Sequence, residues 1–402
     1  KQDYTEEKNE NFWRETLENN IFIICKTKMA MQIVKRTLAG YKEYNVNTLL
    51  IEDVATKLDE NITAVTNYVL NANSWNKEGV QMKFDAVVGN PPYQEMTGGY
   101  GTQAKPIYNL FINMSKSIDS KYISMITPSR WFSGGMGLNE FRKDMLNDTC
   151  LTKIIDYPNT RDVFDSADIA GGVNYFLWDK NNKTECEVTN VINNVKYSSS
   201  RNLNEFNTFV RFNQAIPIIR KVFNVQENGK TLENVVSPQK PFGLPTNYKP
   251  KDKGVPCWFI QKIGKRYADL KDIHDENKLL NKWKLLVPRS PIAGQTDFTK
   301  PVGFYYDGNT NIAKPGECCT ESFIVAGAFD TEEEVKNFKS YLFTKIVRFL
   351  LLQAVVSQDV LRNKFCFVPD LGKYDRIYTD KYLCEKWNIT DDEWKYIDSR
   401  IK

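Results

Sequence analysis

The tetrapeptide Asn90-Pro91-Pro92-Tyr93 carries the residue types with the clearest chemistry in this chain. An asparagine side-chain oxygen and a proline main-chain carbonyl can each accept one hydrogen from an amine, and a tyrosine ring can stack on a planar base. These residues therefore predict a pocket for a planar molecule that bears an NH2 group. A Pro-Pro turn that simply ends a strand is the alternative interpretation.

The segment that must position the tetrapeptide is the apolar run 84–89, which predicts a short, buried, parallel strand. Two prolines cannot continue a strand ladder, so the strand ends at the tetrapeptide. Chemistry in open α/β sheets usually lies just past the carboxyl ends of the strands. The surrounding pattern indicates an α/β fold with a doubly wound, mostly parallel sheet, because strands at about 21–24, 47–51, 122–126 and 173–178 alternate with helices at about 4–19, 28–40, 108–118 and 138–146.

Composition excludes several classes of function. The 402 residues are 41% hydrophobic and contain no apolar run long enough to span a bilayer, so we expect a cytoplasmic protein with no membrane partner. The eight cysteines include no C-x-x-C pair, which favours reduced thiols and no metal site. The single histidine, His274, leaves almost no material for nucleophile–histidine catalysis.

Charge and turn residues predict two domains. Residues 1–200 hold 22 basic and 25 acidic residues, whereas residues 201–402 hold 32 basic and 25 acidic residues. A basic C-terminal half indicates a polyanionic partner, although a solvated surface gives the same composition. We expect a catalytic domain at 1–190, a polar connector at 191–224, and a mixed α+β domain at 225–402 that has many Pro/Gly turns and helices at 331–354 and 380–401.

Residues 84–93 resemble the catalytic motif of the amino-methyltransferases, and most closely that of DNA adenine-N6 methyltransferases of type II restriction–modification systems. The resemblance implies a methyltransferase fold, here N-terminally incomplete, followed by a target-recognition domain. It also implies site-specific methyl transfer from S-adenosyl-L-methionine to N6 of an adenine flipped out of double-stranded DNA. A cognate restriction endonuclease is the implied partner.

The resemblance assigns roles to individual residues. Asn90 and Pro91 would hold the target amine, with Pro92 completing the motif, while Tyr93 and Phe164 would stack on the two faces of the base. The implied cofactor-binding positions are Asp53, Cys25 and Asn90. No general base is required, because positioning the amine against a sulfonium methyl supplies most of the acceleration.

The residues expected to bind the cofactor depart from the family's pattern. No glycine-rich loop precedes Asn90, and Cys25 stands where the family has an acidic residue for the ribose hydroxyls. We expect that an N-terminal segment with this loop is missing. Two alternatives stay open: a DNA-binding specificity module that has lost cofactor binding, and an amino-methyltransferase that acts on RNA or protein.

The C-terminal half resembles the family's target-recognition domain and contains polar side chains suited to DNA. The predicted phosphate contacts are Lys249, Lys251, Lys253, Lys262, Lys265, Arg266, Arg289 and Lys364. The predicted base contacts are Gln295, Gln358, Arg362 and Asn363.

Overall fold

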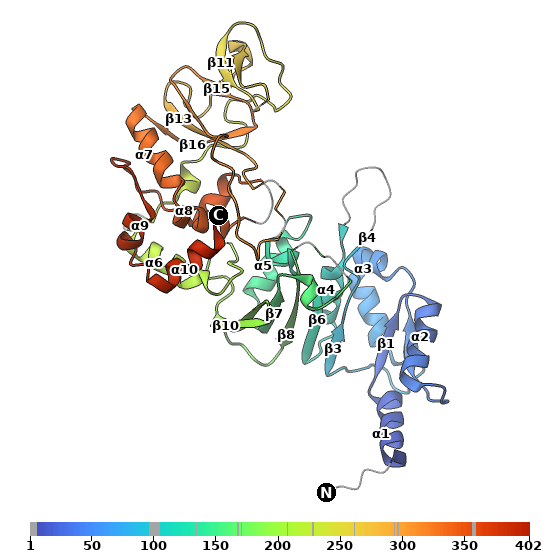
Figure 1. Cartoon of the computed structure of the whole chain (residues 1–402). Coiled ribbons are helices and arrows are strands. Elements are labelled where there is room, and N and C mark those ends of the chain that lie inside the picture. The colour runs from blue at the N-terminus through green and yellow to red at the C-terminus, as the bar shows by residue number, and fades with distance from the viewer. Residues whose placement is uncertain are drawn as a thin grey trace. The chain divides into compact units, whose positions relative to one another are not determined.

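The computed structural model describes two compact units (Figure 1). Unit 1 comprises Lys1–Ile155 and Asn174–Glu187, and unit 2 comprises Asp156–Val173 and Val188–Lys402. The structure describes residues 6–95, 105–133, 135–166, 169, 171–206, 208–226, 229–260, 262–292, 294–295, 297–355 and 359–402. The domain limits expected from the sequence, at 190 and 224, stay a prediction.

Strands alternate with helices through the first half of the chain, as the sequence predicts. The elements are α1 (Glu6–Asn19), β1 (Phe22–Cys25), α2 (Lys28–Ala39), β2 (Asn47–Leu50), α3 (Val54–Leu70), η1 (Ala72–Trp75), β3 (Ala86–Gly89), β4 (Gln94–Glu95), β5 (Lys105–Pro106), α4 (Tyr108–Ser117), β6 (Tyr122–Pro128), η2 (Ser129–Ser133), α5 (Asn139–Asn147), β7 (Leu151–Tyr157), η3 (Thr160–Asp162), β8 (Val173–Asp179), β9 (Cys186–Ile192) and β10 (Val195–Arg201).

Parallel pairing dominates where the candidate site lies. Strands β1 and β2 form a parallel pair, and β3 pairs in parallel with β6. The largest sheet has the strand order β10-β9-β7-β8-β6-β3. The predicted α/β class with a large, mostly parallel sheet is therefore confirmed.

One apolar core holds the start of unit 1 together. Helix α3 buries Leu58, Val65 and Val69 against Leu49 of β2 and Met114 of α4. A non-helical residue, Asn61, interrupts α3, and its side chain accepts a hydrogen bond from Ala64 N. The second half of α3 thus begins with its own side-chain cap.

The expectation that the strand before the tetrapeptide is buried is wrong. Val87 is half-buried, the other three residues of β3 are exposed, and Val88 is 76% exposed. The physical reason is pairing: among the described residues β3 pairs only with β6, so its other edge has no neighbouring strand. An exposed apolar edge of this kind is unusual in soluble proteins.

The sequence analysis predicts no strand in the segment 186–201, where the structure has two. Both β9 and β10 lie in this segment, and they join the largest sheet. Strand β10 is mostly exposed or half-buried, so its serines and its lysine resemble the composition of a linker. Alternation of polar and apolar residues marks a strand with one solvated face.

Unit 2 contains small sheets and a helical layer around its own core. Its further elements are α6 (Ala215–Val225), η4 (Leu232–Asn234), β11 (Val255–Trp258), β12 (Lys265–Ala268), η5 (Leu270–Asp272), β13 (Trp283–Pro288), β14 (Asn311–Ala313), β15 (Cys318–Cys319), β16 (Phe323–Phe329), α7 (Glu332–Leu342), α8 (Lys345–Leu352), η6 (Arg362–Phe367), α9 (Asp380–Lys386) and α10 (Asp391–Arg400). The sheets have the orders β12-β11-β15 and β14-β13-β16. In the described part of the chain, no helix is long and apolar enough to cross a membrane.

Candidate active site

The tetrapeptide Asn90–Tyr93 begins at the residue that follows β3. In the parallel pair, Gly89 lies opposite Met125, so the tetrapeptide and the last residues of β6 leave the pairing side by side. This position is the carboxyl edge of the sheet, where α/β proteins usually bind their ligands. The tetrapeptide thus follows the end of a strand at this edge, as the sequence predicts.

The four side chains of the tetrapeptide differ in accessibility. Asn90 and Pro92 are exposed, Pro91 is buried, and Tyr93 is half-buried. Burial raises the pKa of Tyr93, so its hydroxyl stays neutral near pH 7. The main-chain carbonyl of Tyr93 accepts a hydrogen bond from Ile107 N at 3.2 Å, which ties the tetrapeptide to the start of α4. The tetrapeptide therefore combines an exposed amide with a half-buried aromatic ring.

A small hairpin follows the tetrapeptide and is joined to α3. Strands β4 and β5 pair antiparallel, with Glu95 opposite Lys105. Lys105 Nζ lies 2.7 Å from the carboxylate of Asp59 on α3. Both side chains are about half exposed, so this ion pair contributes little to stability and mainly orients the hairpin.

Buried polar side-chain atoms without a hydrogen-bond partner gather near the tetrapeptide. Among the described residues of unit 1, these atoms include Tyr93 Oη, Asn109 Oδ1, Thr127 Oγ1, Trp131 Nε1 and Asn174 Oδ1. All of them belong to the tetrapeptide, the start of α4, the end of β6, the turn after it or the start of β8. Each buried, unpaired polar atom costs about 1–3 kcal/mol. Such a concentration indicates a place that binds something polar.

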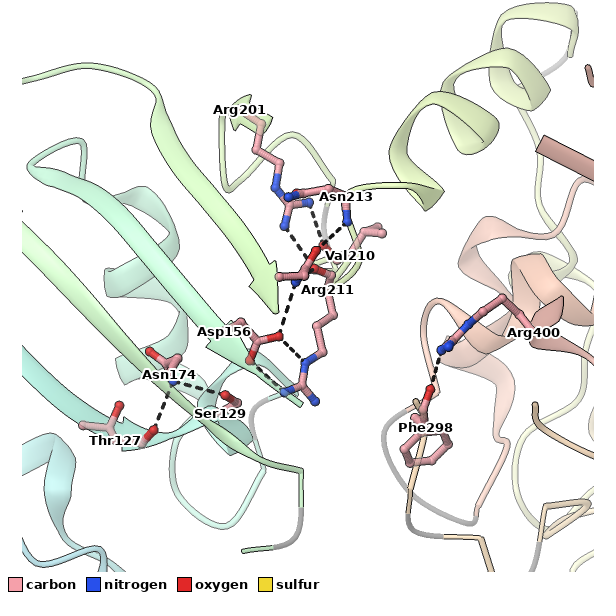
Figure 2. Close-up of polar contacts among 11 residues, drawn as sticks. Thr127, Ser129, Asp156, Asn174, Arg201, Val210, Arg211, Asn213, Phe298 and Arg400 are labelled. Carbon is pink, nitrogen blue, oxygen red and sulfur yellow. Dashed lines mark hydrogen bonds and ion pairs between the residues drawn. The ribbon is translucent and has the colours of Figure 1, made fainter. Parts of the chain in front are cut away.

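Asn174 fixes the end of β6 from the neighbouring strand β8. Its amide nitrogen donates to Thr127 O and Ser129 Oγ, both at 3.3 Å (Figure 2). Asn174 and Thr127 have no exposed surface. One side of the Asn174 amide therefore holds the turn after β6, while its carbonyl oxygen has no partner among the described residues.

The predicted cofactor residues follow two neighbouring strands. Cys25 ends β1 and lies opposite Leu50, the last residue of β2, so Cys25 and Asp53 belong to one edge of this strand pair. Asp53 is exposed at the start of α3, in a left-handed conformation, and makes no capping hydrogen bond there. Cys25 is buried, and burial raises the pKa of its thiol. A carboxylate is thus available between β2 and α3, and a neutral thiol lies at the end of β1.

Both β1 and β3 present a strand edge that no described residue pairs with. Strand β1 pairs with β2, and β3 pairs with β6. The rings of Phe22, at the start of β1, and Phe84, just before β3, have centroids 5.6 Å apart. The beginnings of these two strands therefore lie close together without a direct ladder between them.

A cavity of about 390 Å³ lies beside the end of β2. Its walls are Leu50 and Ile51 together with Lys57, Glu60, Asn61, Ala64, Val65 and Tyr68 of α3. The cavity touches the break in α3 at Asn61. It does not include any of the predicted catalytic or cofactor-binding residues.

The predicted second stacking residue, Phe164, lies in the segment between β7 and β8. It is half-buried, and its backbone N–H donates to Thr160 O at 2.9 Å. Its stacking role stays a prediction. In the same segment, a Cβ on Gly172 would lie 2.1 Å from the carbonyl oxygen of Tyr157, so only glycine fits there.

The predicted phosphate contacts before and within the β11–β12 hairpin form one group. The backbone N–H of Lys251 donates to Tyr267 O at 2.9 Å, which fixes the segment containing Lys249 and Lys253 beside β12. These three lysines, together with Lys262 and Arg266, make no ion pair with any described residue. Lys265 differs, because its Nζ lies 2.5 Å from the carboxylate of Glu317.

The remaining predicted DNA contacts lie elsewhere in unit 2 and several are engaged. Arg289 forms ion pairs with Glu321 and Asp359, and Arg362 Nε donates to Glu233 O. Gln295 donates to main-chain carbonyls, so its amide nitrogen stabilises its own loop. Asn363 and Lys364 lie in η6, and Gln358 lies outside the described residues. Their roles in base or phosphate contact stay predictions.

The sequence analysis did not single out Thr127 or Asn174. One signal was available. Asn174 is the single polar residue in the run 173–178, which is otherwise apolar or aromatic. A buried strand tolerates such a residue only when its amide is hydrogen-bonded or functional.

A known family resembles the part of the chain that contains the tetrapeptide. Residues 19–164 match the family described as Eco57I restriction-modification methylase. The predicted resemblance to restriction–modification methylases is thus confirmed. A protein of Mycoplasma pneumoniae named as an uncharacterized adenine-specific methylase is 34% identical over 103 residues, which are 25% of this chain and 24% of that protein. This chain therefore matches about a quarter of the length of that relative.

Similar solved structures include two restriction–modification enzymes. The type IIG restriction endonuclease BpuSI is 12% identical, with a TM-score of 0.38 over 97% of this chain and 59% of that one. The type IIL enzyme MmeI, solved in complex with DNA, is 9% identical, with a TM-score of 0.39 over 93% of this chain and 60% of that one. Scores at this level do not establish a shared overall arrangement.

Proposed function

We propose that this protein is a site-specific DNA methyltransferase that transfers a methyl group to N6 of adenine in a restriction–modification system. The observation that carries the proposal is the tetrapeptide at the carboxyl edge of β3, together with the buried polar atoms without partners in Tyr93 and in the segments at the ends of the neighbouring strands. The match of residues 19–164 to the Eco57I methylase family supports the same conclusion.

The chemistry follows from the accessible groups of the tetrapeptide. Asn90 Oδ1 and the Pro91 carbonyl accept the two N–H bonds of the adenine amine and direct its lone pair toward the methyl carbon. Adenine N6 is a weak nucleophile because its lone pair is delocalised into the ring, so this directed geometry provides the catalytic effect. The half-buried ring of Tyr93 supports one face of the base. The base reaches the site only after it is flipped out of the duplex.

S-adenosyl-L-methionine is the proposed cofactor, and it supplies a methyl group activated by a positive sulfur. The exposed carboxylate of Asp53, which makes no capping bond in α3, fits the adenine amine of the cofactor. The buried thiol of Cys25 is not an equivalent of a carboxylate for ribose hydroxyls. The unpaired edges of β1 and β3 are compatible with a further parallel strand that completes this part of the sheet.

The proposal extends to partners. Double-stranded DNA is the substrate, and the unpaired cations of the β11–β12 region provide phosphate contacts. A cognate endonuclease that cuts unmodified DNA and a cytoplasmic location complete the system.

The test is to identify the methylated base directly. The protein is incubated with duplex DNA and S-adenosylmethionine that carries an isotopically labelled methyl group, and the DNA is digested for mass spectrometry of its nucleosides. We expect the label in N6-methyladenine. Label in cytosine, or in RNA or protein supplied instead of DNA, contradicts the proposal.

A second candidate function is a DNA-binding specificity module without methyl transfer, which the thiol of Cys25 favours. Calorimetry with S-adenosylmethionine separates the two candidates. The methyltransferase predicts binding that weakens about tenfold in Asp53→Ala, because a charge-assisted hydrogen bond is lost, and is unchanged in the neighbouring control Glu52→Ala. DNA binding without cofactor binding, both by this chain and by a version extended at its N-terminus, supports the second candidate.

A further inference from the structure

Arg289 follows β13 directly, and hydrogen bonds hold its backbone on both sides. Its N–H donates to Ser322 O at 3.0 Å, and its carbonyl accepts a hydrogen bond from Val360 N at 2.8 Å. The side chain is 28% exposed, so the guanidinium is partly buried but still accessible. Arg289 therefore offers several N–H donors from a fixed point of the backbone.

The turn between β15 and β16 places a carboxylate, that of Glu321, against this guanidinium. Thr320 O accepts a hydrogen bond from Phe323 N at 3.1 Å, so Glu321 lies within a closed turn. The turn is also tied to a neighbouring segment, because Glu321 N donates to Leu244 O at 2.9 Å. The side chain of Glu321 is only 15% exposed. Its position is therefore set by the fold.

Two carboxylates flank the guanidinium of Arg289. Its Nη1 lies 3.4 Å from Glu321 Oε1, and its Nε lies 3.5 Å from Asp359 Oδ1. Lys240 Nζ lies 3.3 Å from the other oxygen of Glu321. All three distances exceed the roughly 2.7–2.9 Å of a strong charge-assisted hydrogen bond. The carboxylates thus orient the guanidinium without using all its donors, and Nη2 has no hydrogen-bond partner among the described residues.

The charges of this group cancel, which distinguishes Arg289 from the other predicted phosphate contacts. Arg289 and Lys240 carry two positive charges, and Glu321 and Asp359 carry two negative charges. By contrast, the lysines of segment 249–253 make no ion pair with a described residue. Phosphates attract net positive charge, so a charge-matched group gains little from them. Directional N–H donors remain, and these are what the recognition of base edges requires.

We propose that Arg289 reads a guanine in the major groove of the target sequence. The inference rests on the proposed action on DNA. Guanine presents the acceptors O6 and N7 side by side, and a guanidinium that donates to both is the commonest specific contact. Glu321 and Asp359 are positioning residues, because they orient the guanidinium before DNA binds. The sequence analysis predicts a phosphate contact for Arg289, and its charge-matched surroundings favour a base contact instead.

The test selects DNA by binding and so does not depend on methylation. The protein is mixed with duplexes that contain a randomised segment, and the bound DNA is sequenced. We expect the wild-type preference to include a G·C pair that Arg289→Ala no longer selects, with discrimination about 10–100-fold weaker at that pair and unchanged elsewhere. The slope of affinity against salt should stay the same, because no phosphate contact is removed.

Two further variants and a matched control sharpen the result. Arg289→Met retains the apolar stem and its packing, so it should lose the same preference with a smaller change in melting temperature. Glu321→Gln should weaken the preference for the G·C pair while making the salt slope steeper by about 0.9, because one net positive charge becomes available to phosphates. The control Arg376→Ala removes an exposed arginine of the same unit, paired with Asp375, and should change neither property.

The outcomes separate this inference from the proposed function. An Arg289→Ala protein that keeps every base preference while its salt slope flattens by about 0.9 assigns Arg289 to a phosphate and overturns the inference. Loss of preference at all positions in both Arg289 variants, with lower melting temperatures, assigns a structural role and also overturns it. A wild-type preference without a G·C pair overturns the inference alone. Base preference without methyl transfer overturns only the proposed function, and absence of DNA binding by the wild type overturns both.

Discussion

The buried carboxylate of Asp156 and the buried side chains of Thr127 and Asn174, all drawn in Figure 2, differ in how completely their atoms are hydrogen-bonded. In unit 2, the Asp156 carboxylate accepts two bonds from Arg211, both at 2.7 Å, and one from Asn190 at 3.3 Å. In unit 1, the Thr127 hydroxyl has no partner, and the Asn174 carbonyl oxygen has none. These statements hold for the described residues.

We propose that the difference separates a structural role from a functional one. A buried charge that is fully hydrogen-bonded and paired is tolerated in the folded state, but removal of one partner lowers the free energy of unfolding strongly. A buried polar atom without a partner lowers stability, and natural proteins keep such atoms mainly where a ligand or an ordered water completes the set. The unpaired cluster lies at the edge where the tetrapeptide leaves the sheet, which is where a substrate would bind.

The largest effect is expected from removing the hydrogen-bonded carboxylate of Asp156. Asp156→Ala leaves the Arg211 guanidinium largely buried without its carboxylate, so the free energy of unfolding should fall by about 3–5 kcal/mol. Urea denaturation measures this change. The control Asp330→Ala removes an exposed ion pair with Lys282 and should cost less than about 1 kcal/mol. Equal losses in the two variants contradict the comparison.

A second satisfied group in unit 2 predicts a specific dependence on pH. The ammonium of Lys284 is buried and donates to the carbonyls of Leu280, Lys282 and Lys314. Burial lowers the pKa of Lys284 from 10.5 to about 8. The unfolded chain therefore binds this proton more tightly than the folded chain. The free energy of unfolding should rise as pH increases from about 8 toward 10.5, by at most about 1.4 kcal/mol per pH unit, because the folded protein loses its buried charge there.

The pH dependence is isolated by comparison with Lys284→Met, in which the other lysines titrate as before. Denaturation of both proteins at several pH values should show the difference in unfolding free energy growing in favour of the wild type between about pH 8 and 10.5. A difference that stays flat, or that falls with pH, shows that Lys284 is not desolvated as the structure has it.

A smaller change in stability, of the opposite sign, is expected at Thr127. Thr127→Val removes a buried hydroxyl that has no partner, so stability should rise by about 1 kcal/mol while methylation slows by about tenfold. The control Thr66→Val removes a buried hydroxyl that donates to Ile62 O at 2.8 Å, and should lower stability slightly without affecting methylation. A stabilised Thr127→Val protein with full activity assigns no function to the cluster.

Local pattern predicted much of the fold. Strands β3, β6 and β8 and helices α2, α4 and α5 lie close to their predicted positions, because each combines an apolar stripe or run with clear flanking breakers. The predicted helices 331–354 and 380–401 are each divided, since Thr344 and Thr390 cap new helices, and Thr390 with Glu393 forms a capping box that the sequence contains. Strands β9 and β10 were missed because their polar residues resemble a linker.

The candidate site was predictable only in part. Asn90 and Pro91 carry a local signature, so their position at the end of a strand followed from the sequence. The exposure of Val88 and the partnerless oxygens of Thr127 and Asn174 depend on which strands become neighbours. The ion pair between Lys265 and Glu317 likewise joins residues far apart in the chain. Such tertiary properties cannot be derived from local composition.

The most direct test of the account is the methylation rate of Asn90→Ala, measured beside its affinity for DNA. Asn90 is exposed, so its truncation should leave the melting temperature and DNA binding unchanged. Loss of one of the two acceptors for the adenine amine should slow N6 methylation by about 10²–10³-fold. A variant that methylates adenine at the wild-type rate contradicts the assignment of the tetrapeptide as the catalytic site.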